Sequence, residues 1–205
     1  MEKIKNPPCY LGDISVGKTA IIKYQIEKKF TQTESTIGAA SYNIIIDGKE
    51  LTVYDTAGQE RYNSLIDGYV KGSLVIIIVF DITNEESYDS VLSKWANYIS
   101  DKCDPFSILL VGNKIDLSDD RVISFNDGTK LSNQIKDKFY KEIKGVDREL
   151  DDKRFSYYET SAKNGIGIDI LFHFIAEMAS AAQSLTNTNS VEINKPDQHD
   201  DKCKC

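Results

Sequence analysis

The sequence has no long apolar segment and few cysteines. Its longest aliphatic run, residues 74–80, is far too short to span a bilayer, and its first eight residues contain no stretch that could act as a secretory signal. Of the four cysteines, Cys9 and Cys103 are isolated and Cys203 and Cys205 are the last two, which is neither a disulfide framework nor a zinc-site spacing. We therefore expect a cytosolic chain with reduced thiols.

Positive charge is also scarce. The chain has 25 Lys and Arg against 32 Asp and Glu, a net charge of −7, so it has no overall attraction to a nucleic-acid backbone, and we expect no nucleic-acid partner. Its 205 residues, 40% of them hydrophobic, suffice for one domain with a core. We place this domain at residues 1–183 and expect a disordered tail at 184–205, because the sequence beyond Ser184 is polar and aperiodic.

Segments rich in Ile, Val and Leu alternate with longer segments of helical period. This alternation predicts an α/β fold with helices on both faces of a sheet. Strands are expected at 42–47, 50–54, 74–80 and 107–111, the first two joined by the turn Asp47-Gly48, and helices at 19–29, 86–100, 126–144 and 166–184. The two unbroken apolar strands end in the polar residues Asp81, Asn113 and Lys114, at the sheet edge where ligands bind in such folds.

Residues 12–19 read Gly-Asp-Ile-Ser-Val-Gly-Lys-Thr, a motif whose backbone N–H groups surround nucleotide phosphates. Gly12 and Gly17 permit the backbone angles that such a turn requires. Lys18 is expected to reach the β- and γ-phosphates, Thr19 to offer its hydroxyl to Mg²⁺, and the following helix to direct its positive N-terminus at the phosphates. The candidate nucleotide-binding residues here are Gly12, Asp13, Ile14, Ser15, Val16, Gly17, Lys18, Thr19 and Ala20.

A second motif, Asn113-Lys114-Ile115-Asp116, indicates which base is bound. A carboxylate at Asp116 can accept from both N1–H and N2–H of guanine, and adenine offers no such pair of donors. Together the two motifs predict GTP or GDP as the ligand. A P-loop ATPase or nucleotide kinase is the rival interpretation, and Asn113 and Asp116 argue against it.

The segment Asp55-Thr56-Ala57-Gly58-Gln59 follows a predicted strand. Asp55 is placed to hold a metal through water, the Gly58 N–H to contact the γ-phosphate, and Gln59 to orient an attacking water. Thr36, in the preceding loop, is the expected second side-chain ligand of Mg²⁺, and its loop is expected to order only when the γ-phosphate is present. The predicted metal ligands are Thr19, Thr36 and Asp55, and the predicted catalytic residues are Gln59 and Lys18.

These motifs stand in an order and approximate spacing that resemble Ras-like small GTPases, and the chain is similar to Rab proteins. The resemblance covers about residues 9–182 and the last three residues. It is carried by residues 12–19, 36–40, 54–62, 80–83, 113–116, 159–163 and 203–205. It implies a Ras-like P-loop GTPase domain with a mixed, mostly parallel six-stranded sheet, and slow hydrolysis of GTP to GDP and phosphate in a switch that regulates vesicle traffic.

Further site residues and a branch follow from the resemblance alone. It implies that Asn113 and Asp116 read the base, that Lys114 and Phe30 pack on it, and that the segment Ser161-Ala162-Lys163 completes the guanine pocket. The pair Ala39-Ala40 resembles the early-endosomal branch of the family. The implied location is the cytoplasmic face of intracellular, and in this branch endosomal, membranes, with a cytosolic inhibitor-bound pool.

The terminal Cys203-Lys204-Cys205 resembles the doubly geranylgeranylated end of Rab proteins, and the alternative is two unmodified tail cysteines. Stable anchoring needs two signals, and the tail lysines are offset by aspartates, so two lipids on Cys203 and Cys205 are the expected solution. The resemblance implies a monomer that works with an exchange factor, an activating protein, effectors, a prenylation escort and a GDP-dissociation inhibitor.

Two departures from the family pattern bear on the chemistry. Pro7 and Pro8 fall in the expected first strand, where proline removes a hydrogen-bond donor, so that strand is expected to be short or malformed. Ile14 replaces a small residue and is expected to obstruct a catalytic group supplied by an activating protein. The alternative function is therefore a constitutive GTP-binding interaction module with impaired hydrolysis.

Other departures lie on the surface. The loop at 30–36 is one residue shorter than in similar proteins, which weakens the expectation for Phe30. The positions of an aromatic triad that Rab effectors contact carry Ser41, Tyr54 and Tyr69, so familiar partners are not expected to bind. The charged segment at 141–154 is expected to be a solvated helix or loop, with a partner site as the less favoured alternative.

Overall fold

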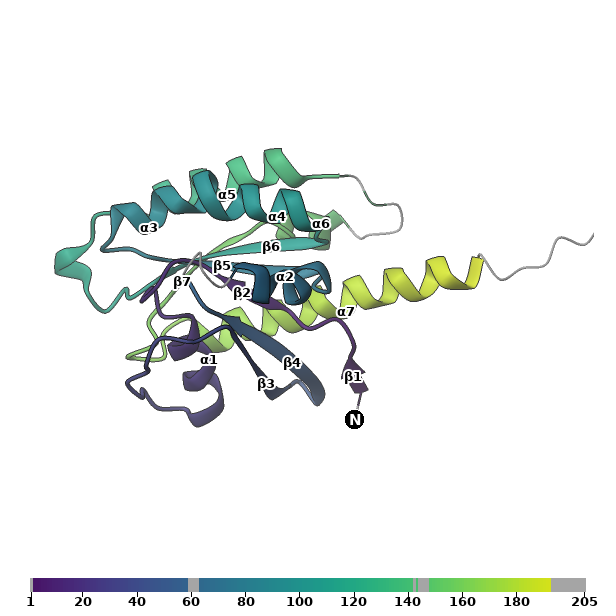
Figure 1. Cartoon of the computed structure of the whole chain (residues 1–205), viewed down its shortest axis with the longest axis horizontal. Helices are drawn as coiled ribbons and strands as arrows, with labels where there is room; N and C mark the ends of the chain where they lie inside the picture. Colours follow the sequence, from purple (N-terminus) through teal and green to yellow (C-terminus); the bar gives the residue numbers. More distant parts are fainter. Residues whose placement is uncertain (1, 59–62, 142, 144–147, 193–205) are drawn as a thin grey trace, which may run out of the picture.

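The computed structural model describes residues 2–58, 63–141, 143 and 148–192. Its sheet is built from β1 (Glu2–Ile4), β2 (Cys9–Leu11), β3 (Ala39–Ile46), β4 (Lys49–Thr56), β5 (Val75–Asp81), β6 (Ser107–Asn113) and β7 (Tyr157–Thr160). Across the sheet β3 pairs with β4, then come β1 and β2 end to end, then β5, β6 and β7. All described pairings except β3 with β4 are parallel, which confirms the expected mostly parallel α/β sheet with six strand positions (Figure 1).

Helices cover both faces of the sheet, as expected. They are α1 (Lys18–Glu27), α2 (Asn63–Lys71), α3 (Glu85–Ser90), the π-helical turn η2 (Val91–Ala96), α4 (Asn97–Lys102), the 3₁₀ turn η3 (Ser118–Asp120), α5 (Phe125–Phe139), α6 (Arg148–Lys153) and α7 (Ile168–Glu192). Helices α1 and α7 share one core with the sheet, and α2, the α3–η2–α4 run and α5 share the other.

The central strands β5 and β6 are buried along their whole length, because both of their faces are covered. Alternate side chains serve the two cores: Ile77 and Val79 face α1 and α7, whereas Ile76 and Ile78 face the opposite helices. Burying one such side chain stabilises the fold by roughly 1.5–3 kcal/mol. This two-sided burial fixes the carboxyl ends of β5 and β6, from which site residues project.

The first strand is broken, as the two prolines predict. Ile4 lies opposite Leu51 and Cys9 opposite Tyr54, so the β1–β2 side contains two more residues than β4 over the same interval. The extra residues form a bulge at Pro7 and Pro8, whose carbonyls accept from the Ser73 hydroxyl (2.7 Å) and the Tyr54 N–H (2.8 Å). The strand resumes at Cys9 and enters the phosphate loop undisturbed.

The expected hairpin is present. Asp47 and Gly48 both have positive φ (51° and 74°), the combination that a two-residue type I′ turn requires. The helix expected over 126–144 ends at Phe139, where Tyr140 turns to extended backbone. Helix α2 and strand β7 had no distinct signal in the sequence, and helix α6 lies in the charged segment that was expected to be a solvated helix or loop.

The C-terminal helix runs further than expected. Helix α7 ends at Glu192, so the expectation of disorder from residue 184 is corrected for residues up to 192. The apolar face of this helix continues to Ala182 and Leu185, which pack on the core, and a helix already nucleated adds further residues at little cost. Residues 193–205 lie outside the described part, and no helix of the described part is long and apolar enough to cross a membrane.

Candidate functional site

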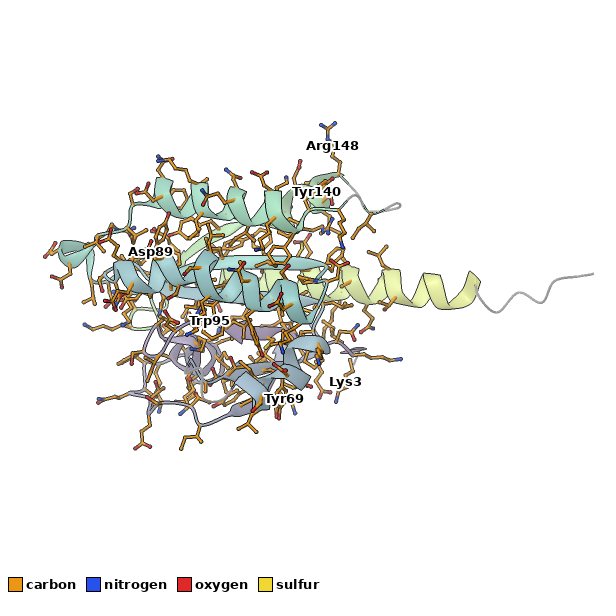
Figure 2. All side chains as sticks on the ribbon, turned by 45° about the horizontal axis from the view of Figure 1, so that its top comes forward. Lys3, Tyr69, Asp89, Trp95, Tyr140 and Arg148 are labelled. Carbon is orange, nitrogen blue, oxygen red and sulfur yellow. The ribbon has the colours of Figure 1, made fainter. Side chains whose placement is uncertain are left out.

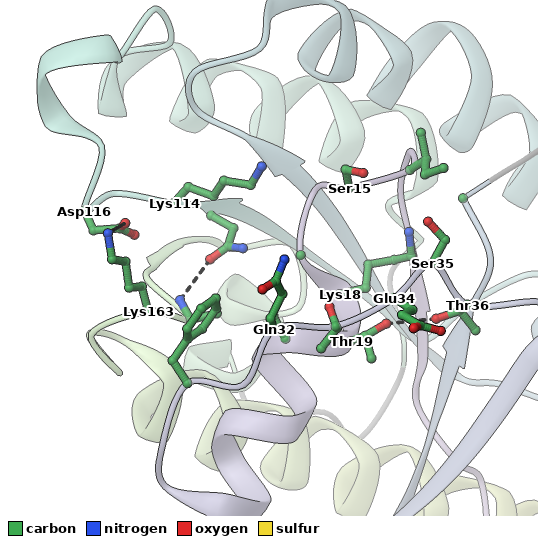
Figure 3. A pocket seen from close by; sticks show the side chains of 18 of the residues that line it. Ser15, Lys18, Thr19, Gln32, Glu34, Ser35, Thr36, Lys114, Asp116 and Lys163 are labelled. Atoms are coloured by element: carbon green, nitrogen blue, oxygen red, sulfur yellow. Dashed lines mark hydrogen bonds and ion pairs between the residues drawn. The ribbon is translucent and has the colours of Figure 1, made fainter.

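A cavity of about 420 Å³ opens at the carboxyl edge of the parallel strands. Its walls come from the loop after β2, the start of α1, the loop before β3, and the loops after β4, β6 and β7. The lining residues are Ile14, Ser15, Gly17, Lys18, Thr19, Ala20, Phe30, Gln32, Thr33, Glu34, Ser35, Thr36, Thr56, Gly58, Asn113, Lys114, Asp116, Leu117, Ala162 and Lys163 (Figure 3). We call the wall around Lys18, Thr19 and Thr36 the phosphate end, and the wall around Asp116 and Lys163 the base end.

The phosphate loop wraps around the ammonium group of Lys18. Its Nζ donates to the carbonyls of Gly12 and Asp13, both at 2.8 Å, and the side chain is almost fully buried. Burial lowers the pKa of Lys18 to about 8, while the carboxylates of Asp55 and Asp13 act in the opposite direction. Anionic phosphates would favour the charged form, so the buried lysine is suited to bind them.

Glycines allow the close approach of backbone at this end. Gly17, with φ 100°, precedes α1, and a side chain there would collide with the amide of Asn113. A Cβ on Gly58 would collide with the backbone of Asp13 and Ile14. The Gly58 N–H is therefore held beside the phosphate loop, where it was expected to meet the γ-phosphate.

The three predicted metal ligands meet, although they come from separate segments. The Thr19 hydroxyl donates to Asp55 Oδ2 at 2.7 Å, the Thr36 hydroxyl donates to the same oxygen at 3.0 Å, and the two hydroxyl oxygens are 2.9 Å apart. Oδ1 of Asp55 is buried and has no hydrogen-bond partner. Burial raises the pKa of Asp55, opposed by the two hydroxyls and by Lys18. This set of hard oxygen donors with an unsatisfied carboxylate oxygen fits Mg²⁺.

The base end is built around Asp116. Its Oδ1 accepts from the Ser161 hydroxyl at 2.6 Å, and its Oδ2 lies 3.9 Å from Nζ of Lys163. Lys114, in a left-handed conformation, forms an ion pair with Asp81 at 2.6 Å. The carboxylate of Asp116 is thus oriented at the cavity wall, and the aliphatic part of Lys114 lines the same wall.

Asn113, which is expected to read the base, lines the cavity and also bonds to two loops. Its amide N–H₂ donates to the Val16 carbonyl at 2.9 Å, and its Oδ1 accepts from the Thr160 hydroxyl at 3.1 Å and the Ala162 N–H at 3.3 Å. The side chain is 1% exposed. In this structure Asn113 ties the phosphate loop to the loop after β7, joining the two ends of the cavity.

The remaining predicted residues lie at the rim of the cavity, behind its wall, or outside the described residues. Phe30 is half-exposed at the rim. Gly12, Asp13, Val16, Asp55 and Ser161 stand behind the lining. Gln59, Cys203 and Cys205 lie outside the described residues.

The structure also adds residues that the sequence did not single out. Gln32, Thr33, Glu34 and Ser35 line the cavity because the loop before β3 folds over it, and Thr56 and Leu117 complete the lining. Behind the phosphate loop, Asp13 Oδ1 accepts from Lys94 Nζ and from the Trp95 indole N–H, both at 3.0 Å. The only available signal was the spacing of Trp95 within an amphipathic helix, which predicts a core residue equally well.

Comparison with known proteins agrees with this geometry. Residues 9–181 match the Ras family. The chain is also 34% identical to the Ras-related protein Rab-10 of Caenorhabditis elegans over 173 residues, covering 82% of this chain and 77% of that protein. The chain belongs to the Ras family. It is a Rab-type GTPase that binds GTP and GDP with Mg²⁺ and hydrolyses GTP, and Rab-type GTPases work with regulators and effectors.

Proposed function

We propose that this Rab-type GTPase is a timed switch of vesicle traffic, whose GTP and GDP states differ in the loops that carry Thr36 and Gln59. One observation carries the proposal: Thr19, Thr36 and Asp55 converge at the phosphate end. Thr36 comes from a loop with no helix or strand between α1 and β3, and its neighbour Ile37 is 79% exposed. A loop this exposed, with Thr36 at the metal-ligand cluster, is suited to order around a γ-phosphate.

The proposed reaction is in-line attack of water on the γ-phosphorus of GTP, which forms a P–O bond and breaks the bond to the β-phosphate oxygen, releasing GDP and phosphate. Gln59 orients the water, and Lys18 and the Gly58 N–H stabilise the charge on the phosphate oxygens. Thr19, Thr36 and Asp55 would hold Mg²⁺, which would neutralise negative charge on the nucleotide phosphates. Without an activating protein such sites turn over at roughly 10⁻⁴ s⁻¹.

The base end supplies guanine selectivity in this proposal. Asp116, oriented by Ser161, accepts from N1–H and N2–H of guanine, while Lys114 and Phe30 flank the ring and Lys163 borders the pocket. The tight bond from Ser161 fixes the carboxylate before the nucleotide arrives. The buried amide of Asn113 fixes the position of this end relative to the phosphate loop, because it donates to the Val16 carbonyl.

The membrane part of the proposal rests on the terminal cysteines. Lipid chains on Cys203 and Cys205 would hold the protein on the cytoplasmic face of intracellular membranes, and a GDP-dissociation inhibitor would keep a cytosolic pool. The early-endosomal branch stays a prediction from Ala39 and Ala40. That familiar effectors do not bind at Ser41, Tyr54 and Tyr69 stays a prediction from the sequence; the rings of Tyr54 and Tyr69 meet edge to face there, 4.8 Å between centroids.

Ile14 bears on activation. Its side chain is 46% exposed at the rim of the phosphate end, so it is accessible to an incoming protein. We keep the prediction that it slows stimulated turnover, and equal stimulation of wild type and Ile14→Ser by the cognate activator would contradict it. The family comparison does not favour the alternative of a constitutive module with impaired hydrolysis.

The deciding experiment is binding of fluorescent GDP and GTP analogues to the purified protein with Mg²⁺, competed by unlabelled ATP, followed by single-turnover hydrolysis. Guanine-selective binding with slow, measurable hydrolysis is the expected result. Tight GTP binding without hydrolysis would contradict the timed switch, and equal affinity for ATP would contradict the roles of Asp116 and Ser161.

A further inference from the structure

One side of the α3–η2–α4 run contacts two elements of the nucleotide site at once. Lys94 and Trp95 bind the Asp13 carboxylate behind the phosphate loop. One and two turns further along, Tyr98 and Lys102 bind Asp67 of helix α2, the phenol donating to Oδ1 at 2.6 Å and the ammonium to Oδ2 at 2.8 Å. We call Lys94, Trp95, Tyr98 and Lys102 the brace.

The brace is internally packed. The Lys94 ammonium lies 4.5 Å from the centre of the Trp95 ring, the Trp95 and Tyr98 rings meet edge to face at 6.2 Å, and the Lys102 ammonium lies 5.7 Å from the centre of the Tyr98 ring. Trp95 is 1% exposed and lies on the inner side of the helical run (Figure 2). The π turn at residues 91–96 includes Lys94 and Trp95, and such turns are common at functional sites.

Both partners of the brace are adjacent to groups that act on the γ-phosphate. The carbonyl of Asp13 accepts from Lys18, and its backbone contacts Gly58. Asp67 lies in the second turn of α2, a helix that begins four residues after Gln59. The brace therefore connects the phosphate loop to the far end of the short segment that carries Gln59.

We propose that Asp67 is a positioning residue for GTP hydrolysis: held by Tyr98 and Lys102, it fixes helix α2 relative to the phosphate loop and so sets where Gln59 meets the attacking water. The proposal rests on the proposed role of Gln59. Misplacing a reacting group by about 1 Å lowers a rate by up to about 10²-fold, so a loose α2 affects the reaction before it affects the fold.

The chemistry of the contact supports this role. The bonds from Lys102 and Tyr98 lower the pKa of Asp67, so the carboxylate stays charged, and burial raises the pKa of Tyr98, so the phenol stays a donor. The Lys102 and Asp67 side chains are 29% and 26% exposed, and a partly exposed ion pair contributes little to overall stability. The contact is therefore suited to orient α2 while adding little to the stability of the fold.

The test compares Tyr98→Phe, Lys102→Met and the double variant in the full chain. Each substitution removes one donor to Asp67 and keeps the bulk of the side chain. Lys138→Met is the matched control, because it removes a lysine that donates to Asn97 of the same helix at 2.6 Å, away from the brace. Single-turnover hydrolysis, GDP affinity and thermal unfolding are measured for each variant.

We expect the double variant to hydrolyse GTP about ten-fold more slowly, with GDP affinity within about two-fold of wild type, and Lys138→Met to behave like wild type. A wild-type rate in the folded double variant overturns the proposal. So does a loss of GDP affinity as large as the loss of rate, because it would show a general structural role.

Two further measurements separate this proposal from the role of Gln59. If Gln59→Ala hydrolyses GTP normally, the proposed function of Gln59 is wrong, whatever the brace does. If Gln59→Ala is slow and the double variant is normal, only the brace is wrong. Amide exchange of residues 63–71 must also be faster in the double variant than in wild type, with strand β5 unchanged, and equal exchange in α2 overturns the proposal.

Discussion

The two ends of the nucleotide cavity are held in different ways. At the base end, Asp116, Ser161 and the Lys114–Asp81 pair stand at or just beyond the ends of the buried strands β5 and β6 and the partly buried strand β7. At the phosphate end, Thr36 comes from an exposed loop, and one oxygen of Asp55 has no partner. The base end holds its carboxylate in place without a ligand, whereas in our proposal the phosphate end would gain its missing contacts from the cation and the γ-phosphate. A nucleotide switch needs a rigid end that binds GDP and GTP alike and a responsive end that distinguishes them.

The largest effect on this comparison is expected from Lys18→Met. The lysine would donate charge-assisted bonds to phosphates that GDP and GTP share, each worth about 1.5–3 kcal/mol, so both affinities should fall by at least about 100-fold. Titration with a fluorescent GDP analogue measures this, with the exposed Lys29→Met as control. A loss below about ten-fold would mean that Lys18 mainly serves the carbonyls of the phosphate loop.

Asp116→Asn is expected to come next, and it should affect the base end alone. The amide keeps one acceptor and turns the other into a donor that opposes the N–H groups of guanine, so the affinities for GDP and GTP should fall by about 30-fold each. Competition titrations with both nucleotides measure the ratio, and Asp119→Asn, on the nearby turn η3, is the control. Unequal losses for GDP and GTP would contradict the separation of the two ends.

Thr36→Ala should affect the phosphate end alone and should therefore lower the affinities for GTP and GDP unequally. Loss of one hydroxyl ligand is expected to lower GTP affinity by about ten-fold in Mg²⁺ and GDP affinity by about two-fold or less, because the loop is proposed to close on the γ-phosphate. Chelation of Mg²⁺ should abolish the difference between variant and wild type. The control is Thr31→Ala, which removes a hydroxyl of the same loop that donates to Glu27 at the end of α1. Equal losses for the two nucleotides would show that this loop does not sense the γ-phosphate.

The sequence predicted the parts of the molecule that depend on local chemistry. The phosphate loop, the Asp47-Gly48 turn and the disrupted strand at Pro7 and Pro8 follow from glycine and proline constraints, and the structure has all three. The buried strands β5 and β6 follow from unbroken apolar runs. Strands of this kind place the residues that follow them at one edge, which is why Asp81 and Lys114 meet.

Contacts between distant segments could not be predicted in the same way. Arg154 closes a charged segment expected to be solvated, yet it is 1% exposed, because Phe106, Tyr140 and Phe155 surround its guanidinium and Asp151 pairs with it. Helix α6, which ends one residue before Arg154, is exposed or half-exposed, as expected. A pattern of charges along the chain does not show which charge folds inward. The brace on Asp13 and Asp67 was missed for the same reason.

The smallest effect is expected from Ser161→Ala, which tests whether the base end is already oriented before the nucleotide binds. The variant keeps the Asp116 carboxylate and removes only the 2.6 Å bond that orients it, so the affinities for GDP and GTP should fall equally, by about five-fold. Ser118→Ala removes a neighbouring hydroxyl with a long 3.4 Å contact to Asp119 and should change neither affinity. A loss of nucleotide affinity as large as that of Asp116→Asn would mean that the Asp116 carboxylate is not correctly oriented without Ser161. A loss of affinity for GTP alone would instead show that a change at the base end alters phosphate binding. Asn113 would be the connection, because it bonds to both the phosphate loop and the loop carrying Ala162, and the two ends would then be coupled.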